Sequence, residues 1–590
     1  MKKTTASLTS FFILSILTTN SRLPIFAQQE KQPSPVFRIT SSRVRVDFVA
    51  VDKQGRFVND LRSNEVEIYE DGKKQNVDVF YAPGESRQKE LVSPGGAGAA
   101  GTGVASSSGP ATALANAAKT IIVIDSRTID SNNFVHSVAA IRNFVERHLT
   151  AGHAVMIAEV YRGLRVLTPM TRDKATLLAG VDKLKPQSVY NPLDASRVLT
   201  QGYFHDLELQ ITDLREALTV LCYSLAGQAG RKHVVFFSEG YPIQALKLAE
   251  MQMREAVSEE KSSAVRQAAA REVGRYQDPN VLGMVRDVVS AANNFGISFY
   301  TVDARGLIAL QGVGSPDKSG NVAAGPGAGA RLEEQGRPDL AAAARSQNAR
   351  ASETEVGPSE QIVATFNLTA LSNLDDAQNT LIALAAGTNG LAFYHTNNLG
   401  IVLSYSATEQ ENYYLASYIP NAKRKTGQFH TISVRAARPG IFIRSRMGYV
   451  DIPEDALRNA RLSSALRHPE LFGQIAPLLQ IEPSKGKTRV VTGIPGSQVE
   501  FRQDAGKYAA QVSFLGMVYD SNGKPISKDF SINKGFNLAL TPEQFQGLGN
   551  NPLLSSTELN LSSGRYRLVL LVEDRLGGSL GASVQEFQVP

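Results

Sequence analysis

The chain has 590 residues, more than one hydrophobic core normally serves, so about three or four domains are expected. With 42% hydrophobic and 20% charged residues, the composition is that of a globular protein and excludes a disordered chain. The formal net charge is +6, but Lys2, Lys3 and Arg22 lie in the first 27 residues without any acid, so the rest carries +3. Such a weak excess does not indicate nucleic acid as a partner.

Residues 1–27 have the pattern of a secretory signal peptide. Lys2 and Lys3 precede a short apolar segment, residues 11–17, and Ala27 is a small residue at which cleavage can occur. The apolar segment is shorter than a bilayer-spanning helix, although an uncleaved anchor is the alternative. No later segment has the apolar length of a membrane span. We therefore expect an exported protein with no membrane span after signal cleavage.

Cysteine content gives a second indication of the compartment. Cys222 is the only cysteine, so no disulfide can form within the chain. Export without disulfides is typical of bacterial proteins of the periplasm or the medium rather than of small eukaryotic ectodomains. We expect a bacterial, periplasmic or secreted protein.

Residues 36–83 are expected to form a small N-terminal β module. Apolar and polar residues alternate there, and Asp71-Gly72 is a strong hairpin signal because Gly tolerates positive φ. A Gly/Ala/Ser-rich linker is expected over residues 84–117. Its GAGAAG, residues 96–101, matches a dinucleotide fingerprint only formally, because no strand precedes it and no helix follows.

Residues 118–405 show nearly continuous apolar strands that alternate with helices, which predicts an α/β domain with a mostly parallel sheet covered on both faces. The expected strands are TIIVIDS at 120–126, AVMIAEV at 154–160, LRVLTPM at 164–170, HVVFFSEG at 233–240, ISFYTVDARG at 297–306 and LAFYHTN at 391–397. Helical spacing is found at 132–149, 171–184 and 207–227. Two insertions interrupt the pattern, a charged Ala-rich one at 241–280 and a loop-like one at 308–370.

The remainder of the chain returns to alternating β patterns. We expect a β extension at 406–452, a helical linker at 453–475 and a C-terminal β-sandwich-like domain at 476–590. VDKQGRFV at 51–58 and YDSNGKPI at 519–526 share a strand end, an Asp, a turn Gly and a basic residue. Two related β modules and a common turn chemistry used twice both explain this similarity.

An ordered set of segments over residues 43–450 resembles the von Willebrand factor A-related bacterial family known from Acidobacteria. The segments are VRVDFVAVDKQGRFVNDL, VEIYEDGKKQ, TIIVIDS, GRKHVVFFSEG, ISFYTVDARG, LAAGTNGLAFYHTNNL, NYYLASYIP and RSRMGYV. The resemblance implies an A-domain, a doubly wound sheet of strand order 3-2-1-4-5-6, flanked here by small β-sandwich-like modules. Such domains are usually adhesion or protein-binding modules, and many bind a divalent cation at a metal-ion-dependent adhesion site.

This strand order predicts where a ligand would bind. Where strands one and four lie side by side, their connections leave to opposite faces and open a crevice beyond their carboxyl ends. Asp125 ends the first strand, Ser238 and Glu239 end the fourth, and Asp303 ends the fifth. We expect these side chains to line one ligand-binding crevice, together with residues of the turn after Asp125.

That turn departs from the metal-binding pattern of the family, Asp-x-Ser-x-Ser after strand one, a Thr from a later loop and an Asp after strand four. Arg127 and Ile129 occupy the two serine positions, and the strand-four acid is Glu239. The Thr position falls within PQSVYNPLD, with Ser188 as a substitute. Asp125 and Glu239 would be the metal ligands only if a divalent cation such as Mg²⁺ binds at all, and we expect no cofactor.

Several interpretations of the turn after Asp125 remain open. Ser126, Thr128 or Asp130 supplies oxygen ligands if the turn is rebuilt in another register. Alternatively, Arg127 repels a cation and pairs with Asp125 or Glu239, as an internal ion pair. The acids would otherwise cap the N-termini of helices.

No complete catalytic pattern is present. FFSEG, with Ser238, lacks the first Gly of G-x-S-x-G, and His233 lies at the opposite end of the same strand. The eight histidines are dispersed, without a zinc-ligand spacing. We therefore expect a non-catalytic protein-binding or adhesion module with unidentified protein partners. A structural scaffold of the cell envelope is the alternative, and an enzyme of unrecognised kind the third.

Overall fold

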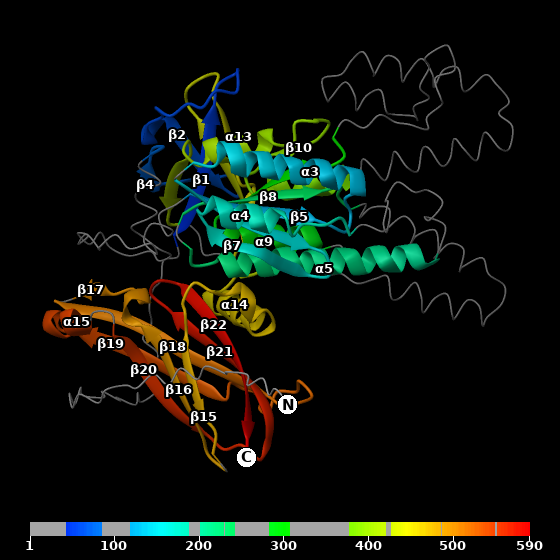
Figure 1. The fold of residues 1–590 in the computed structure, drawn as a ribbon. Coiled ribbons are helices and arrows are strands. Elements are labelled where there is room, and N and C mark those ends of the chain that lie inside the picture. The colour runs from blue at the N-terminus through cyan, green and yellow to red at the C-terminus, as the bar shows by residue number, and fades with distance from the viewer. Residues whose placement is uncertain are drawn as a thin grey trace, which may run out of the picture. The chain divides into compact units, whose positions relative to one another are not determined.

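A computed structural model of the chain (Figure 1) describes residues 43–84, 118–150, 152–187, 201–228, 230–241, 283–306, 377–420, 426–484, 486–504, 506–548 and 551–590. The signal segment, almost all of the expected linker and both expected insertions lie outside these residues. Among the described residues, no helix has the length and hydropathy that crossing a membrane requires.

A six-stranded sheet forms the centre of the α/β domain. Its strands are β5 (Ala118–Asp125), β6 (His153–Val160), β7 (Leu164–Thr171), β8 (Lys232–Ser238), β9 (Ile297–Asp303) and β10 (Ala392–Phe393). They lie in the order β10-β9-β8-β5-β6-β7, which is the 3-2-1-4-5-6 order expected from the sequence. β5, β6, β8, β9 and β10 run parallel, and β7 is antiparallel to β6.

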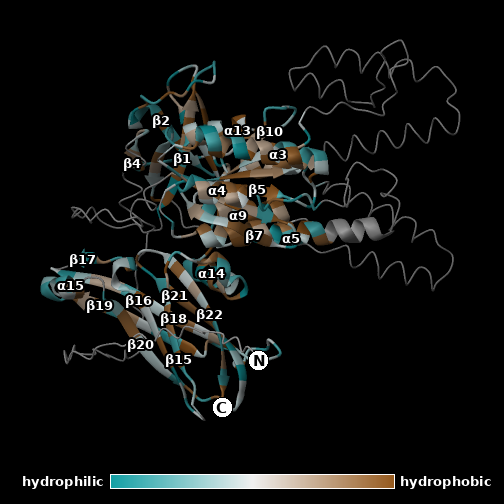
Figure 2. Cartoon of the chain, viewed as in Figure 1, coloured by the Kyte–Doolittle hydropathy of each residue, from teal (hydrophilic) through white to brown (hydrophobic). Residues whose placement is uncertain are grey.

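Helices cover both faces of this sheet. One face packs against α3 (Ser131–Asn143), its continuation η2 (Phe144–His148), α4 (Lys174–Val181) and α13 (Ile401–Glu409), whereas the other packs against α5 (Gln201–Leu225) and α9 (Met284–Asn294). Every residue of β5, β6, β8 and β9 is buried, which explains why these strands read as continuous apolar runs. In Figure 2, β5 is hydrophobic and α3 carries alternating hydrophilic and hydrophobic stripes.

The N-terminal β module combines strands from two segments of the chain, one before and one after the α/β domain in the sequence. One sheet has the order β13 (Phe442–Ser445), β1 (Val44–Val51), β11 (Tyr414–Tyr418) and β4 (Val77–Tyr81). The other has the order β14 (Gly448–Val450), β12 (Phe429–Ala436), β2 (Val66–Glu70) and β3 (Lys73–Gln75). The expected separation into a module at 36–83 and an extension at 406–452 is therefore wrong. Each segment alone has too few strands to bury both faces of a core, and together they enclose one.

The C-terminal region begins with α14 (Glu454–Arg467) and η3 (Pro469–Leu471), in the expected helical segment. A three-stranded sheet, β15 (Leu478–Glu482), β16 (Thr488–Pro495) and β20 (Pro552–Leu559), follows. The second sheet holds β17 (Arg502–Asp504), β18 (Lys507–Tyr519), β21 (Gly564–Asp574) and β22 (Ser579–Val589), and β19 (Ile532–Leu540) also pairs with β18. The short segments η1 (Ser63–Glu65), η4 (Gly496–Gln498) and α15 (Pro542–Leu548) complete the described elements.

The two similar turns have the same geometry. Asp52 Oδ1 accepts the backbone N–H groups two and four residues later, and Asp520 Oδ1 does the same. In both turns the Gly three residues after the Asp has a φ of +76°, which only Gly adopts readily. Each turn follows a long strand, β1 or β18. The two sequences therefore form the same turn, which both explanations of their similarity predict.

Candidate functional site

Asp125, at the end of β5, is fully buried. Its Oδ2 accepts hydrogen bonds from the hydroxyl groups of Thr128 at 2.8 Å, Ser238 at 2.9 Å and Tyr241 at 2.8 Å. Its Oδ1 accepts the backbone N–H of Arg127 at 3.2 Å. The carboxylate is therefore surrounded by donors of the protein itself.

Thr128 connects the ends of β5 and β8. Its Oγ1 lies 3.1 Å from Ser238 Oγ and accepts the backbone N–H of Glu239 at 3.3 Å. Ser238 Oγ also accepts the backbone N–H of Gly240 at 3.0 Å. The two strand ends are thus linked through short side chains, as the strand order predicts.

Glu239 serves the start of α3. Its Oε1 accepts the backbone N–H of Asp130 and the side-chain amide of Asn133, both at 2.9 Å. The Asp130 side chain in turn accepts the N–H of Asn132, as the N-cap of the helix. This arrangement is the helix-capping use of acids that the sequence left open.

Asp303, at the end of β9, is held by a different set of donors. Arg305 donates through its Nε at 2.8 Å and Nη2 at 3.0 Å to the two carboxylate oxygens, and Gln378 donates to Oδ2 at 2.8 Å. The Arg305 side chain is only 4% exposed. Asp303 therefore orients a buried guanidinium at the same edge of the sheet as Glu239.

The turn residues that differ from the metal pattern point away from the crevice. Ser126 donates to Glu159 on β6 at 2.5 Å, and Arg165 forms an ion pair with that same carboxylate. Arg127 pairs with Asp213 on α5. The expectation that Arg127 pairs with Asp125 or Glu239 is therefore wrong, because the α5 carboxylate is within reach of its long side chain.

Burial sets the protonation behaviour of the two central acids. Burial raises the pKa of Asp125, and the hydrogen bonds from Thr128, Tyr241 and Ser238 offset this only in part. Burial likewise raises the pKa of Glu239, against the lowering effects of Asn133 and the Arg305 charge. Neither carboxylate has the direct arginine partner that Asp303 has among the described residues.

These residues do not fit a divalent cation. Mg²⁺ takes oxygen ligands in near-octahedral geometry, and Ca²⁺ takes even more of them. Here Asp125 already accepts hydroxyl protons, Ser126 faces Glu159, and Ile129 is buried in the core. The Arg305 guanidinium supplies positive charge near Glu239 instead. Ser188 and most of its loop lie outside the described residues.

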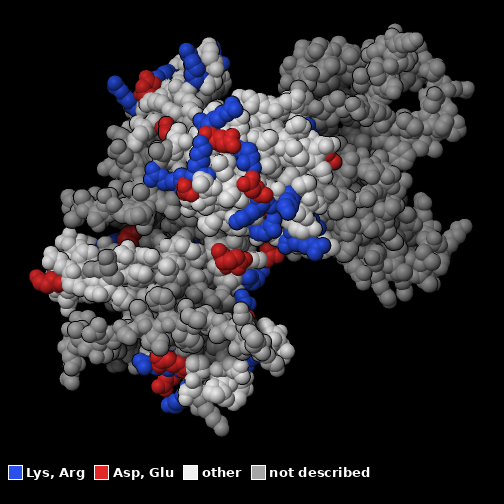
Figure 3. Space-filling model, viewed as in Figure 1, with Lys and Arg blue, Asp and Glu red and all other residues white. Residues whose placement is uncertain are grey.

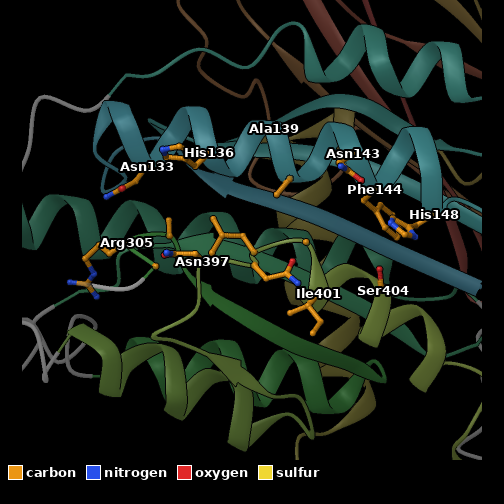
Figure 4. Close-up of a pocket in the computed structure, with 16 residues that line it drawn as sticks. Asn133, His136, Ala139, Asn143, Phe144, His148, Arg305, Asn397, Ile401 and Ser404 are labelled. Atoms are coloured by element: carbon orange, nitrogen blue, oxygen red, sulfur yellow. The ribbon is translucent and has the colours of Figure 1, made fainter. Parts of the chain in front are cut away.

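A groove of about 750 Å³ opens beside this cluster. It runs between α3 with η2 and the segment from Asn397 to Ser404, and Figure 4 shows Arg305 near one end and His148 near the other. Its described lining contains Arg305, two histidines and four asparagines, and no acidic residue is among these described residues. The groove can therefore accept a group that carries negative charge.

The remaining surface gives no sign of a single charge type. On the face shown in Figure 3, basic and acidic side chains are interspersed.

His233, on β8, lies away from Ser238: its Nδ1 is 3.0 Å from the carbonyl and hydroxyl oxygens of Ser406. Burial, followed by the Arg231 charge, lowers its pKa well below the usual value. Ser238 thus has no basic partner among the described residues.

Sequence reasoning missed four residues of the cluster, namely Asn133, Tyr241, Arg305 and Gln378. Tyr241 and Arg305 each lie two residues beyond a predicted strand-end acid, so their proximity was a usable signal. Gln378 follows residues that the structure does not describe, and nothing in the sequence connects it with β9.

Comparisons with known proteins give structural likenesses at low identity. No family model matches the sequence, and no curated protein matches it. The conserved hypothetical protein BatB from Bacteroides thetaiotaomicron is 12% identical with a TM-score of 0.22, and the match covers 50% of this chain and 98% of that one.

Two further solved structures match over more of the chain. Three N-terminal domains of the type V pili tip protein Mfa5 from Porphyromonas gingivalis are 10% identical with a TM-score of 0.25, covering 80% of this chain and 92% of that one. A von Willebrand factor type A structure from Catenulispora acidiphila is 8% identical with a TM-score of 0.20, covering 80% and 66%. At these scores the likenesses carry no argument about function.

Proposed function

We propose that this chain is an exported, non-catalytic protein-binding or adhesion module built on an A-domain whose metal-ion-dependent adhesion site is degenerate. The strand order of the sheet and the resemblance in sequence support the A-domain assignment. The signal-like residues 1–27 support export. We assign the binding face to the groove, whose wall includes Asn133, which donates to Glu239, and Arg305, which donates to Asp303.

One observation carries the proposal: the acid at the expected metal position, Asp125, accepts hydrogen bonds from protein groups. Asp125 is satisfied by three hydroxyl donors, and the buried guanidinium of Arg305 lies in the groove wall. A partner's acidic side chain can enter a groove that has no carboxylate of its own, because no like charge repels it.

Catalysis is not proposed, because Ser238, Asp125 and Glu239 lack the partners that a reaction needs. Ser238 donates to Asp125 and has no histidine beside it among the described residues. Glu239 is occupied with the start of α3. These hydrogen bonds explain the positions of all three side chains without a substrate.

The test compares two variants in which glutamate adds negative charge, one inside the groove and one outside it. His136→Glu combined with Ile401→Glu puts carboxylates on both walls of the groove, whereas Val135→Glu puts one on α3 outside the groove lining. We expect the double variant to lose proteins captured from a cell-envelope extract, the Val135 variant to keep them, and chelation by EDTA to change nothing.

Two results would contradict the proposal. Capture that requires Mg²⁺ and stops with EDTA would restore a metal-dependent site. Capture that is indifferent to the groove variants but disappears when residues 476–590 are deleted would favour the scaffold alternative, in which the C-terminal sheets hold the partners.

A further inference from the structure

A second group of side chains with metal-ligand chemistry lies in the N-terminal β module, away from the crevice residues. Glu70 ends β2, Asp71 begins the two-residue turn to β3, and His430 lies on β12. One ligand atom from each lies within 4.8 Å of the others. His430 Nδ1 is 2.8 Å from Asp71 Oδ2 and 3.7 Å from Glu70 Oε1. The three come together although 359 positions separate Asp71 from His430.

Each of the three side chains is oriented by a further contact. Glu70 Oε2 accepts the Tyr418 hydroxyl at 2.5 Å, and its Oε1 accepts the Tyr449 hydroxyl at 3.3 Å. The His430 ring stacks on the Tyr449 ring with a centroid separation of 5.5 Å. Such outer partners fix the direction of metal ligands in known sites.

Asp71 is fixed from the backbone side. Its Oδ1 accepts the backbone N–H of Thr431 at 2.8 Å, and its own N–H donates to the Thr431 carbonyl at 3.0 Å. Its φ of +50° is the value that an Asp-Gly hairpin turn requires. The turn thus holds Oδ2 toward His430 while Oδ1 is occupied.

The charge around Glu70 differs from that around the acids of this chain that pair with arginine. Asp47, Asp303 and Glu409 each pair with an arginine. No lysine or arginine among the described residues forms an ion pair with Glu70 or Asp71. The nearby Arg446 donates instead to the carbonyl oxygens of Asn293 and Arg45. Two carboxylates therefore face one imidazole nitrogen, which can donate a proton to only one of them.

We propose that Glu70, Asp71 and His430 bind a divalent transition-metal ion of the Zn²⁺ class. One nitrogen and two carboxylate oxygens form a ligand set that Zn²⁺ accepts, with bonds of about 2.0–2.2 Å. Neighbouring ligands of a tetrahedral zinc are roughly 3.3–3.6 Å apart at those bond lengths. The two nitrogen–oxygen separations here, 2.8 and 3.7 Å, lie on either side of that range, and the two carboxylate oxygens lie within 4.8 Å of each other, so binding requires the carboxylates to move toward the ion. The ion would link the β2–β3 turn to β12.

The experiment is a titration of the tag-free full-length chain with Zn²⁺, followed by calorimetry, and with Co²⁺, followed by its visible absorption. We expect a Zn²⁺ site that is lost in His430→Gln and weakened at least about tenfold in Asp71→Asn, a change on an exposed turn that preserves the fold. His468→Gln is the matched control, because His468 also lies near two carboxylates, those of Glu216 and Glu470.

Three outcomes would overturn the proposal: no Zn²⁺ binding by the wild type, binding unchanged in both Asp71→Asn and His430→Gln, or binding lost in His468→Gln. Circular dichroism of each variant separates loss of the site from loss of the fold, and Asp71→Asn decides if His430→Gln does not fold. Tyr418→Phe tests the role of Glu70, with an expected weakening of about 10–100-fold. Unchanged affinity there would remove Glu70 from the site.

Discussion

The two edges of the six-stranded sheet bury acidic side chains in different ways. At the carboxyl edge, Asp125 and Glu239 accept hydrogen bonds from neutral hydroxyl, amide and backbone donors. At the amino edge, Arg231 pairs with Asp47 at 3.0 Å and with Glu409 at 3.3 Å, and Arg444 also pairs with Glu409. Asp125 and Glu239 are therefore stabilised by dipoles, although Asp303 at the same edge pairs with Arg305, whereas Asp47 and Glu409 at the amino edge both pair with arginines.

This difference corresponds to the part of the molecule that each edge of the sheet contacts. Asp47 belongs to β1 and Arg444 to β13, so the amino-edge ion pairs attach the N-terminal β module to the α/β domain. The Arg231 side chain is only 2% exposed there. Buried ion pairs require matched geometry, which can select one arrangement of the two parts. The carboxyl edge faces the groove, where no second module is attached among the described residues.

The largest expected effect comes from removing Arg231 at the amino edge, which tests whether full charges stabilise that edge. Arg231→Met leaves Asp47 without its ion-pair partner and Glu409 with only Arg444, so we expect a loss of about 3–5 kcal/mol in the free energy of unfolding. Guanidinium titration measures it.

Arg286→Met is the matched control for this change. Arg286 lies on α9 with a 76% exposed side chain paired to Asp287, so its removal should cost no more than about 0.5 kcal/mol. Equal losses in the two variants would show that the amino-edge network adds nothing specific to stability.

A second prediction uses pH to separate the two edges. Desolvation raises the pKa of the partly buried Asp47, but the charges of Arg231 and Arg446 and the hydrogen bond from Asn389 together lower it by more. Its contribution to stability is therefore present above its unfolded pKa, near 3.8, and is lost as the pH falls through the lower folded value. The pKa of Asp125 is raised instead, so its contribution is present below about pH 3.8 and is lost as the pH rises through the folded value.

The variants Asp47→Asn and Asp125→Asn test these signs. The destabilisation caused by Asp47→Asn should shrink as the pH falls below 3.8, whereas that caused by Asp125→Asn should shrink as the pH rises above it. Unfolding free energies between pH 3 and 7 measure both, in roughly the range where the two carboxyls titrate. Parallel curves for the two variants would remove the distinction between the edges.

The strands themselves were predictable from the sequence because four of them are buried along their whole length and read as apolar runs, whereas their order was implied only by the resemblance to the A-domain family. The contact between the ends of β5 and β8, through Thr128 and Ser238, followed from that order. The pairing of β1 with β11 could not be predicted, because the paired residues Val44 and Tyr418 lie far apart in the sequence. Local alternation predicts a strand but does not name its neighbour.

The site itself was only partly predictable for a similar reason. The departures at Arg127 and Ile129 were visible in the sequence, and they indicated the poor fit to a cation. The partner of Arg127 was not, because Asp213 lies on a helix 86 positions later. The grouping of Glu70, Asp71 and His430 has no sequence signature either, because its histidine is supplied by a strand beyond the α/β domain.

The smallest expected effect is that of breaking the Arg127–Asp213 pair, which differs from the ion pairs of the amino edge in its exposure to solvent. It joins full charges, as at the amino edge, but the side chains are 20% and 38% exposed. Solvent screens such a pair, so Asp213→Asn should lower the free energy of unfolding by less than about 1 kcal/mol. It frees Arg127 to turn toward the crevice, yet Asp125 keeps its three hydroxyl donors. Calorimetry with Mg²⁺ should therefore show no binding in the variant, as in the wild type. Mg²⁺ binding that appears in the variant would show that the three hydroxyl donors of Asp125 do not keep a cation out.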